Sequence, residues 1–356
     1  MTTLVRNAWY VAAWSTEIDQ ELRRFVLLGD PVLLFRRSDG RVAALEDVCP
    51  HRQLPLSHGK RIGDTVQCGY HGLTFDTEGK CVRVPGQDRI PLSAMVDAYP
   101  IEERHGIVWI WMGDPQRADP DEIFDLPQFH DAGWHAHHGG ALHLKSNYLN
   151  VAENLVDPAH VSFVHETTLG NAASENVPVH VSTEGAEIVA WRWIRDAEPI
   201  GFFKAFGGFS GNVDRWHYYH LRLPCTAYID FGSADTADEI AEDDRDSGTR
   251  VFALHFITPV SENYTIDRWM HLRNKAVGTE EASAKMDAMF ETAFSEDKAI
   301  LEAVHQEEQR PRKRRPIRLA IDKGPMVYRK RIAELLERER TEDASGPGNG
   351  SYVFHD

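Results

Sequence analysis

The sequence lacks any run of about 18 apolar residues, which predicts that no helix of this chain spans a membrane. Its start, MTTLVRNAWYVAAW, lacks the charged segment, apolar core and cleavage site of an export signal, so we expect a cytoplasmic protein. Basic residues are scarce, because 39 Lys and Arg stand against 55 Asp and Glu, a formal charge of −16. This charge disfavours nucleic acid and anionic membranes as partners. Cysteine is also rare, with four in 356 residues, so a paired cysteine motif is improbable by chance.

The length suits two domains, each large enough to bury its own core. Residues 1–117 alternate short β-branched and aromatic runs with turn signals such as Asp39-Gly40, which predicts an all-β domain. The polar, proline-containing stretch 114–120 predicts the boundary. Residues 118–343 mix helical and strand-like segments, as expected of an α+β domain. The Gly- and Ser-rich tail 344–356 is predicted to be disordered.

Hydrophobic periodicity and turn signals predict the elements of the second domain. Helices are expected near 147–166, 279–309 and 325–340, and strands near 177–195, 215–231 and 250–272. The acidic stretch 234–246 predicts a solvated, mobile loop. The basic run 310–315 has two interpretations, a solvated loop or a docking patch for an acidic electron carrier.

Two Cys-His pairs lie in the predicted β domain, Cys49-Pro-His51 and Cys68-Gly-Tyr-His71. A Rieske [2Fe–2S] cluster places two thiolates on one iron and two imidazoles on the other, which raises its potential above that of an all-cysteine cluster. Cys49 and Cys68 would hold one iron, and His51 and His71 the other. A structural zinc accepts the same four side chains. Zinc fingers, however, usually pair like with like, whereas each pair here mixes the two ligand types.

A second group of metal-binding residue types lies at 154–165, in the sequence NLVDPAHVSFVH. Asn154, Asp157 and His160 fall along one face of a regular helix. His165 follows His160 by five residues and therefore lies about 140° away. A local distortion or a helix end is needed to direct both rings at one metal. Taken alone, the two histidines are better explained as ordinary core or surface residues, and a third ligand is needed to favour a metal site.

A third ligand is predicted on the helix at 286–304, where apolar residues recur at spacings of three and four. Asp297 lies on that apolar face, where an ionised carboxylate is costly unless it is paired or binds a metal. Its neighbour Glu296 is expected to point elsewhere, into solvent. Two histidines and one aspartate form the facial triad of non-heme Fe(II) oxygenases, so we predict His160, His165 and Asp297 as iron ligands.

Together, the motifs CPHR, CGYH, NLVDPAH, VSFVH and FSEDKAILEA resemble those of the Rieske non-heme iron oxygenases, and most of all the group of vanillate, toluenesulfonate and dicamba oxygenases. The resemblance extends from RNAWYVAAW through PGQDRIP and WIWMGDP to the C-terminal helices. It implies an N-terminal Rieske domain and a catalytic domain whose antiparallel sheet is flanked by helices, the helix-grip type. It also implies a homotrimer, in which Asp157 bridges His71 of a neighbouring subunit and His160 of its own.

The resemblance assigns roles to four further positions. Asn154 matches an asparagine near the iron, with helix capping or packing as the alternative. His255 matches a substrate-contacting histidine of the dicamba enzyme. Asp230 and Ala288 stand where that enzyme has an asparagine and a tryptophan. We therefore predict Asp230, His255 and Ala288 in the substrate pocket, and the two departures argue against the same substrate.

The implied activity is that of the terminal oxygenase of a multi-component monooxygenase. Electrons would come from NAD(P)H through a separate reductase, with or without a ferredoxin. With O2, the enzyme would O-demethylate a small methoxyarene and release formaldehyde. Two alternatives stay open. The same machinery could hydroxylate an aryl methyl or ring carbon or cleave an aryl ether, or the chain could be a Rieske electron-transfer protein without a second iron.

Overall fold

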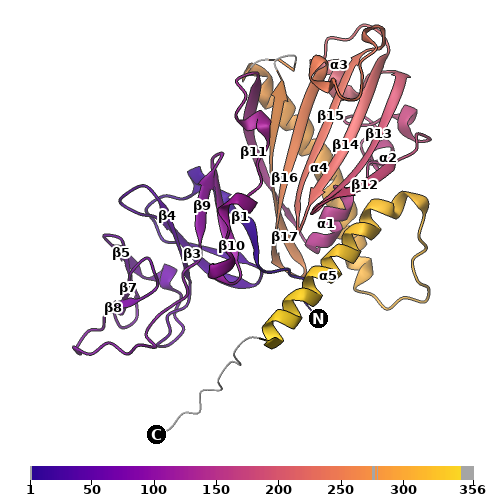
Figure 1. The fold of residues 1–356 in the computed structure, drawn as a ribbon. Helices are drawn as coiled ribbons and strands as arrows, with labels where there is room; N and C mark the ends of the chain where they lie inside the picture. Colours follow the sequence, from indigo (N-terminus) through magenta and orange to yellow (C-terminus); the bar gives the residue numbers. More distant parts are fainter. Residues whose placement is uncertain (1, 275–276, 279, 346–356) are drawn as a thin grey trace.

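The structure, a computed structural model, describes residues 2–274, 277–278 and 280–345 (Figure 1). Within these ranges the chain forms an N-terminal part of small antiparallel sheets and a larger part in which helices pack on a seven-stranded antiparallel sheet. The predicted all-β and α+β organisation is confirmed. No helix in the described ranges is both long and apolar enough to cross a bilayer.

Three small sheets build the N-terminal part, in the orders β1-β10-β9, β2-β3-β4 and β5-β6-β7-β8. Their strands are β1 (Ala8–Trp14), β2 (Arg23–Leu27), β3 (Asp30–Arg36), β4 (Val42–Glu46), β5 (Lys60–Ile62), β6 (Thr65–Gln67), β7 (Thr74–Phe75), β8 (Cys81–Arg83), β9 (Ile101–Arg104) and β10 (Ile107–Met112). Three short 3-10 turns then lead to the large sheet, and each begins at a proline, namely Pro115, Pro120 and Pro127. The domain boundary at 114–120 stays a prediction.

The large sheet has the order β11-β17-β16-β15-β14-β13-β12. Its strands are β11 (Trp134–Leu144), β12 (His180–Glu184), β13 (Glu187–Ala197), β14 (Val213–Arg222), β15 (Thr226–Asp235), β16 (Thr249–Ser261) and β17 (Tyr264–Asn274). Each of the three predicted strand regions is therefore a hairpin of two strands. The prediction missed β11, whose sequence contains Gly139-Gly140. A Cβ on Gly139 would lie 2.1 Å from the ring of Trp269, so this strand requires glycine where it crosses the indole.

Five α-helices occur in the described ranges: α1 (Tyr148–Asn154), α2 (Val161–Val164), α3 (Gly201–Phe206), α4 (Ser283–Glu308) and α5 (Lys323–Ser345). The continuous helix predicted at 147–166 is wrong, because the chain leaves helical geometry between α1 and α2. The long helix predicted at 279–309 corresponds to α4. Helix α5 extends past the predicted 325–340 and includes Ala344 and Ser345, and the rest of the predicted disordered tail lies outside the described residues.

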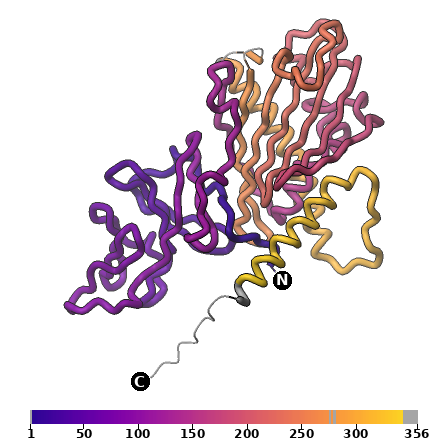
Figure 2. Tube along the Cα trace, viewed as in Figure 1, coloured from indigo at the N-terminus to yellow at the C-terminus, as the bar shows by residue number. Residues whose placement is uncertain are grey.

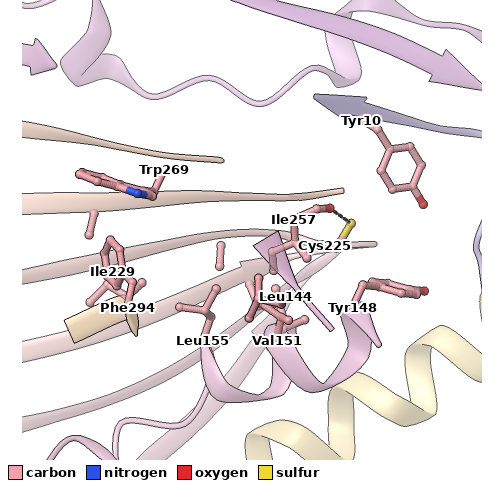
Figure 3. Packing of buried hydrophobic residues seen from close by; sticks show 14 of the residues in the cluster. Tyr10, Leu144, Tyr148, Val151, Leu155, Cys225, Ile229, Ile257, Trp269 and Phe294 are labelled. Atoms are coloured by element: carbon pink, nitrogen blue, oxygen red, sulfur yellow. Dashed lines mark hydrogen bonds between the residues drawn. The ribbon is translucent and has the colours of Figure 1, made fainter. Parts of the chain in front are cut away.

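One large apolar core joins the two parts of the molecule. Figure 3 shows Tyr10 of β1 near Tyr148 of α1 and Cys225, whose thiol donates to the carbonyl of Ile257 at 2.9 Å. Cys225 is thus a buried structural residue. Nearby, the hydroxyl of Thr258 on β16 donates to a carbonyl of β1 at 2.8 Å. Shared burial and these contacts fix the N-terminal part against one end of the large sheet.

Candidate metal centres and active site

The two Cys-His loops of the N-terminal part have the same backbone geometry. In each, the cysteine N–H donates to the carbonyl five residues later, at 2.9 Å for Cys49 and 2.8 Å for Cys68. The residue four positions later donates back to the cysteine carbonyl, at 2.9 Å from Gln53 and 3.2 Å from Gly72. Gln53 and Gly72 both have a left-handed φ, 58° and 75°. Two turns with the same hydrogen-bond pattern therefore present a Cys-x-His pair and a Cys-x-x-His pair.

These turns bring the four predicted cluster ligands together. Cys49 and Cys68 are buried in the same apolar cluster, whereas His51 and His71 are exposed and their ring centroids lie 4.5 Å apart. Burial raises the pKa of the Cys49 thiol, and the adjacent Cys68 adds to this. Two sulfurs on the inner side and two imidazoles on the outer side suit a [2Fe–2S] cluster with one iron of each kind.

The predicted iron ligands also meet, at the break between α1 and α2. Asp297 of α4 lies with Oδ2 3.2 Å from Nε2 of His165 and with Oδ1 3.6 Å from Nε2 of His160. The ligand atoms all lie within 4.8 Å of one another. The distortion required by the five-residue spacing is present, since His160 precedes α2 and His165 follows it. The donor set is therefore that of a mononuclear Fe(II) centre with open positions.

Two neighbouring side chains orient these ligands. Glu296 accepts a hydrogen bond from Nδ1 of His165 at 2.8 Å, so the prediction that Glu296 points into solvent is wrong. A metal would replace the hydrogen that Nε2 of His165 shares with Asp297 at 3.2 Å, so that Nδ1 keeps donating to Glu296 and Nε2 offers its lone pair. The amide of Asn154 donates to Oδ1 of Asp297 at 3.1 Å. Burial alone would raise the pKa of Asp297, but the hydrogen bond from His165 and the nearby His160 lower it. The carboxylate is thus held ionised.

Asp157 lies beside the trio rather than in it. Its Oδ2 is 3.9 Å from Nδ1 of His160, longer than a hydrogen bond, and Oδ1 accepts the N–H of Ala159 at 2.9 Å. Nδ1 of His160 is buried without a hydrogen-bond partner. Burial raises the pKa of Asp157. This carboxylate is 26% exposed and therefore accessible from outside the subunit. Its role as a bridge between metals stays a prediction.

A mainly apolar pocket opens onto the trio. His255 lines it, and Nδ1 of this ring is 2.7 Å from Oδ2 of Asp267, whereas Nε2 is buried and unpartnered. Phe294 of α4 packs edge-on against His255, with ring centroids 4.6 Å apart. Apart from the three ligands, the lining consists of Asn154, Leu155, Val161, Leu169, His217, Tyr219, Ile229, Phe231, Ala253, His255 and Phe294. The shape and lining of this pocket suit a small, largely apolar molecule beside the iron ligands.

Comparison with known proteins agrees with both metal centres. Residues 8–100 match the Rieske [2Fe-2S] domain, and residues 144–338 match the vanillate O-demethylase oxygenase C-terminal domain. The chain belongs to the Rieske non-heme iron oxygenases. This oxygenase is 38% identical over 340 residues to the iron–sulfur subunit of a toluene-4-sulfonate monooxygenase system from Comamonas testosteroni, covering 94% of this chain and 98% of the relative.

Two further likenesses place the oxygenase in the same group. It is 32% identical over 342 residues to the oxygenase component of dicamba O-demethylase from Stenotrophomonas maltophilia, covering 95% of this chain and 99% of the relative. The crystal structure of dicamba monooxygenase bound to 3,6-dichlorosalicylic acid matches with a TM-score of 0.84 at 30% identity, over 95% of this chain and 99% of that chain.

The oxygenase is therefore the terminal component of a multi-component Rieske monooxygenase system. Its cofactors are a Rieske [2Fe–2S] cluster and a mononuclear non-heme iron, with electrons from NAD(P)H through partner proteins. The alternatives of a structural zinc site at the Cys-His loops and of a simple electron-transfer protein are wrong, because both the Rieske domain and the oxygenase domain are present.

Two predicted pocket residues of the oxygenase lie elsewhere. Asp230 of β15 is flanked by Ile229 and Phe231, which line the pocket, so strand alternation directs its side chain to the opposite face. There it is buried and accepts hydrogen bonds from Arg250, at 2.8 and 2.7 Å, and from Arg245 at 3.0 Å. The prediction of Asp230 in the pocket is wrong.

The second correction concerns α4. Ala288 is exposed on the outer side of this helix, so its prediction as a pocket residue is also wrong. The alignment to a pocket tryptophan gave no information about which side of α4 this position occupies. Sequence reasoning missed most of the pocket walls, among them His217 and Tyr219, which are two residues apart on β14. Residues two apart on a strand share one face, so this spacing could have placed both side chains in the pocket once the strand and its pocket-facing side were known.

The acidic stretch 234–246 also contacts the face of the large sheet that is opposite the pocket. Most of it is exposed, as expected of a solvated loop, but Ile240 is buried and Arg245 binds Asp230. The basic run 310–315 is exposed, in agreement with the solvated-loop interpretation and equally with the docking one.

Proposed function

We propose that this oxygenase O-demethylates a small methoxyarene. One methoxyarene, one O2, one NAD(P)H and one proton give the phenol, formaldehyde, water and NAD(P)+. The observation that carries the proposal is the small apolar pocket that opens directly onto His160, His165 and Asp297. The match to the vanillate O-demethylase oxygenase domain and the likeness to dicamba O-demethylase support this reaction among those of the family.

Three groups of residues have separate roles in this reaction: the iron ligands, the apolar pocket walls and His255. Iron bound by the two histidines and Asp297 supplies the reductive activation of O2 and the oxidation of the methyl C–H bond. The apolar walls, including Ile229 and Phe294, hold the aromatic ring and exclude water. His255, oriented by Asp267, offers its Nε2 to a polar group of the substrate. A hydroxylated methoxy carbon is a hemiacetal, which expels formaldehyde and leaves the phenol.

We further propose that the oxygenase forms a homotrimer, as the family resemblance implies, and that electrons pass from the cluster of one subunit to the iron of its neighbour. The Cys68 turn lies between β6 and β7, and Figures 1 and 2 draw the β5–β8 sheet well away from α1 and α2. A neighbouring subunit would therefore bring its exposed His71 to the accessible carboxylate of Asp157. The reductase and any ferredoxin would deliver electrons to this cluster. A cytoplasmic location stays a prediction.

Hydroxylation of an aryl methyl group is the second candidate function. The relative that is 38% identical is named as part of a toluene-4-sulfonate monooxygenase system, and the same apolar pocket accepts a methyl as readily as a methoxy group. Ring hydroxylation and aryl-ether cleavage stay open as alternatives with no separate observation in their favour.

The test compares products from matched substrates. The purified oxygenase, reconstituted with a reductase, is supplied with O2 and with 4-methoxybenzoate, 3-methoxybenzoate or 4-toluenesulfonate. Formaldehyde in equal amount to the O2 consumed, with the phenol as the second product, supports O-demethylation. A benzylic alcohol from 4-toluenesulfonate, with no formaldehyde from either methoxybenzoate, would transfer the assignment to methyl hydroxylation. The His160→Ala variant reports the background.

A further inference from the structure

Helix α4 carries a second carboxylate that lies between two histidines, ten residues before Asp297. Oδ2 of Asp287 is 2.9 Å from Nε2 of His137, and its Oδ1 is 3.5 Å from Nε2 of His271. The histidines come from neighbouring strands, since His137 of β11 and His271 of β17 face each other in the antiparallel register. One helix and two strands thus converge on one point that the oxygenase chemistry does not use.

The geometry of this trio resembles that of the iron ligands. Both trios consist of two histidines and one aspartate of α4, and both present Nε2 atoms to the two carboxylate oxygens. The corresponding distances at Asp297 are 3.2 and 3.6 Å. In both trios the ligand atoms lie within 4.8 Å of one another. Two ligands about 2.0–2.1 Å from a tetrahedral metal are about 3.3 Å apart, close to the 3.5 Å between Asp287 and His271.

The second trio also leaves buried polar atoms without partners. His271 is fully buried, and neither of its ring nitrogens has a hydrogen-bond partner, nor has Oδ1 of Asp287. A buried polar atom without a partner destabilises the fold unless something satisfies it. A cation between Nε2 and Oδ1 would satisfy both atoms at once.

A third His-Asp-His group in the chain shows the contrasting case. Nε2 of His105 and Nε2 of His130 each lie 2.8 Å from a separate oxygen of Asp125, whose side chain is 44% exposed. Both contacts are ordinary hydrogen bonds, and the carboxylate is solvated. That group is satisfied without an ion, so it serves as a matched control.

We propose that His137, His271 and Asp287 form a second mononuclear site, for a divalent transition-metal ion. Zn2+ is the expected occupant, because two imidazoles and a carboxylate suit it and because such sites bind Zn2+ more tightly than Fe2+. The ion can enter from solvent, since the side chains of His137 and Asp287 are 29% and 26% exposed. It ties α4 to β11 and β17, and water completes its coordination.

The experiment counts zinc on the iron-loaded holoprotein. Wild type and the variants Asp287→Asn and Asp125→Asn are equilibrated with excess Zn2+, freed of loosely bound metal, and analysed for zinc and iron by mass spectrometry. We expect wild type and Asp125→Asn to retain one zinc per chain more than Asp287→Asn, with equal iron in all three. Equal zinc in wild type and Asp287→Asn would overturn the proposal.

A second measurement guards against a folding defect in the variant. The Rieske EPR signal of Asp287→Asn should equal that of wild type, and His137→Gln, altered at a partly exposed ligand, should lose the same zinc equivalent. Zn2+ should raise the melting temperature of wild type and leave that of both ligand variants unchanged. A zinc-dependent rise of the same size in His137→Gln would likewise refute the site.

Discussion

Removal of the Glu296 carboxylate should weaken iron binding without touching an iron ligand. Glu296 accepts the Nδ1 proton of His165 at 2.8 Å and thereby fixes both the ring orientation and the tautomer. Loss of such a supporting carboxylate typically costs 10–100-fold in metal affinity. At about 1.4 kcal/mol per factor of ten, the expected penalty for Glu296→Ala is about 1.4–2.8 kcal/mol. Glu296→Gln keeps a neutral acceptor, so its iron affinity should lie between those of wild type and Glu296→Ala.

The assay is anaerobic competition between the holoprotein and a graded series of Fe(II) chelators. The iron retained beyond the two cluster irons gives the relative affinity, and the Rieske EPR signal confirms that the N-terminal part is intact. Glu291→Ala, an exposed glutamate of the same helix, is the control and should match wild type. Wild-type iron affinity in Glu296→Ala would refute the orienting role, because the substitution removes the acceptor entirely.

Three further outcomes follow from the assigned contacts. His160→Ala should lose the mononuclear iron and all turnover while the Rieske EPR signal persists, and turnover at the wild-type rate would eliminate the proposed centre. Asp157→Asn should keep both metals but slow electron transfer between them by at least tenfold in single-turnover measurements, whereas loss of the mononuclear iron would make Asp157 a ligand. Asp230→Asn should destabilise the fold by about 3–5 kcal/mol, because Arg250 is left buried without its main partner. The exposed control Asp246→Asn, which contacts the same arginine, should cost less than about 1 kcal/mol, and equal denaturation midpoints of the two variants would contradict this reading.

The metal ligands could be predicted from sequence because each carries a local signal. Cys49 and Cys68 stand at fixed short distances from a histidine, and the two turns indeed share one hydrogen-bond pattern. Asp297 was found because a carboxylate interrupts an apolar helical face, which is informative only when burial forces the charge to find a partner. Even the break before His165 could be anticipated, since five residues cannot keep one face of a helix.

The pocket could not be predicted in the same way, because its walls depend on strand parity. In a sheet a shift of one residue moves a side chain to the other face, so Asp230 and its neighbour Ile229 have opposite environments. An alignment that is uncertain by one residue therefore cannot show which face of the sheet a strand residue occupies. Glu296 was missed for a related reason: periodicity describes a helix, whereas the partner of Glu296 approaches from α2.

Helix α4 is the element through which the two metal sites would influence each other. At 100° per residue, Asp287 and Asp297 lie about 80° apart around the axis and about 15 Å apart along it, so they contact different partners. Asp287 faces the β11–β17 edge, and Asp297 faces the break between α1 and α2. A rotation of α4 that released Asp287 from His271 would turn Asp297 by the same angle. Since the iron ligands tolerate displacements of only a few tenths of an ångström, an ion at Asp287 would stabilise the iron centre by holding the helix rather than by touching it.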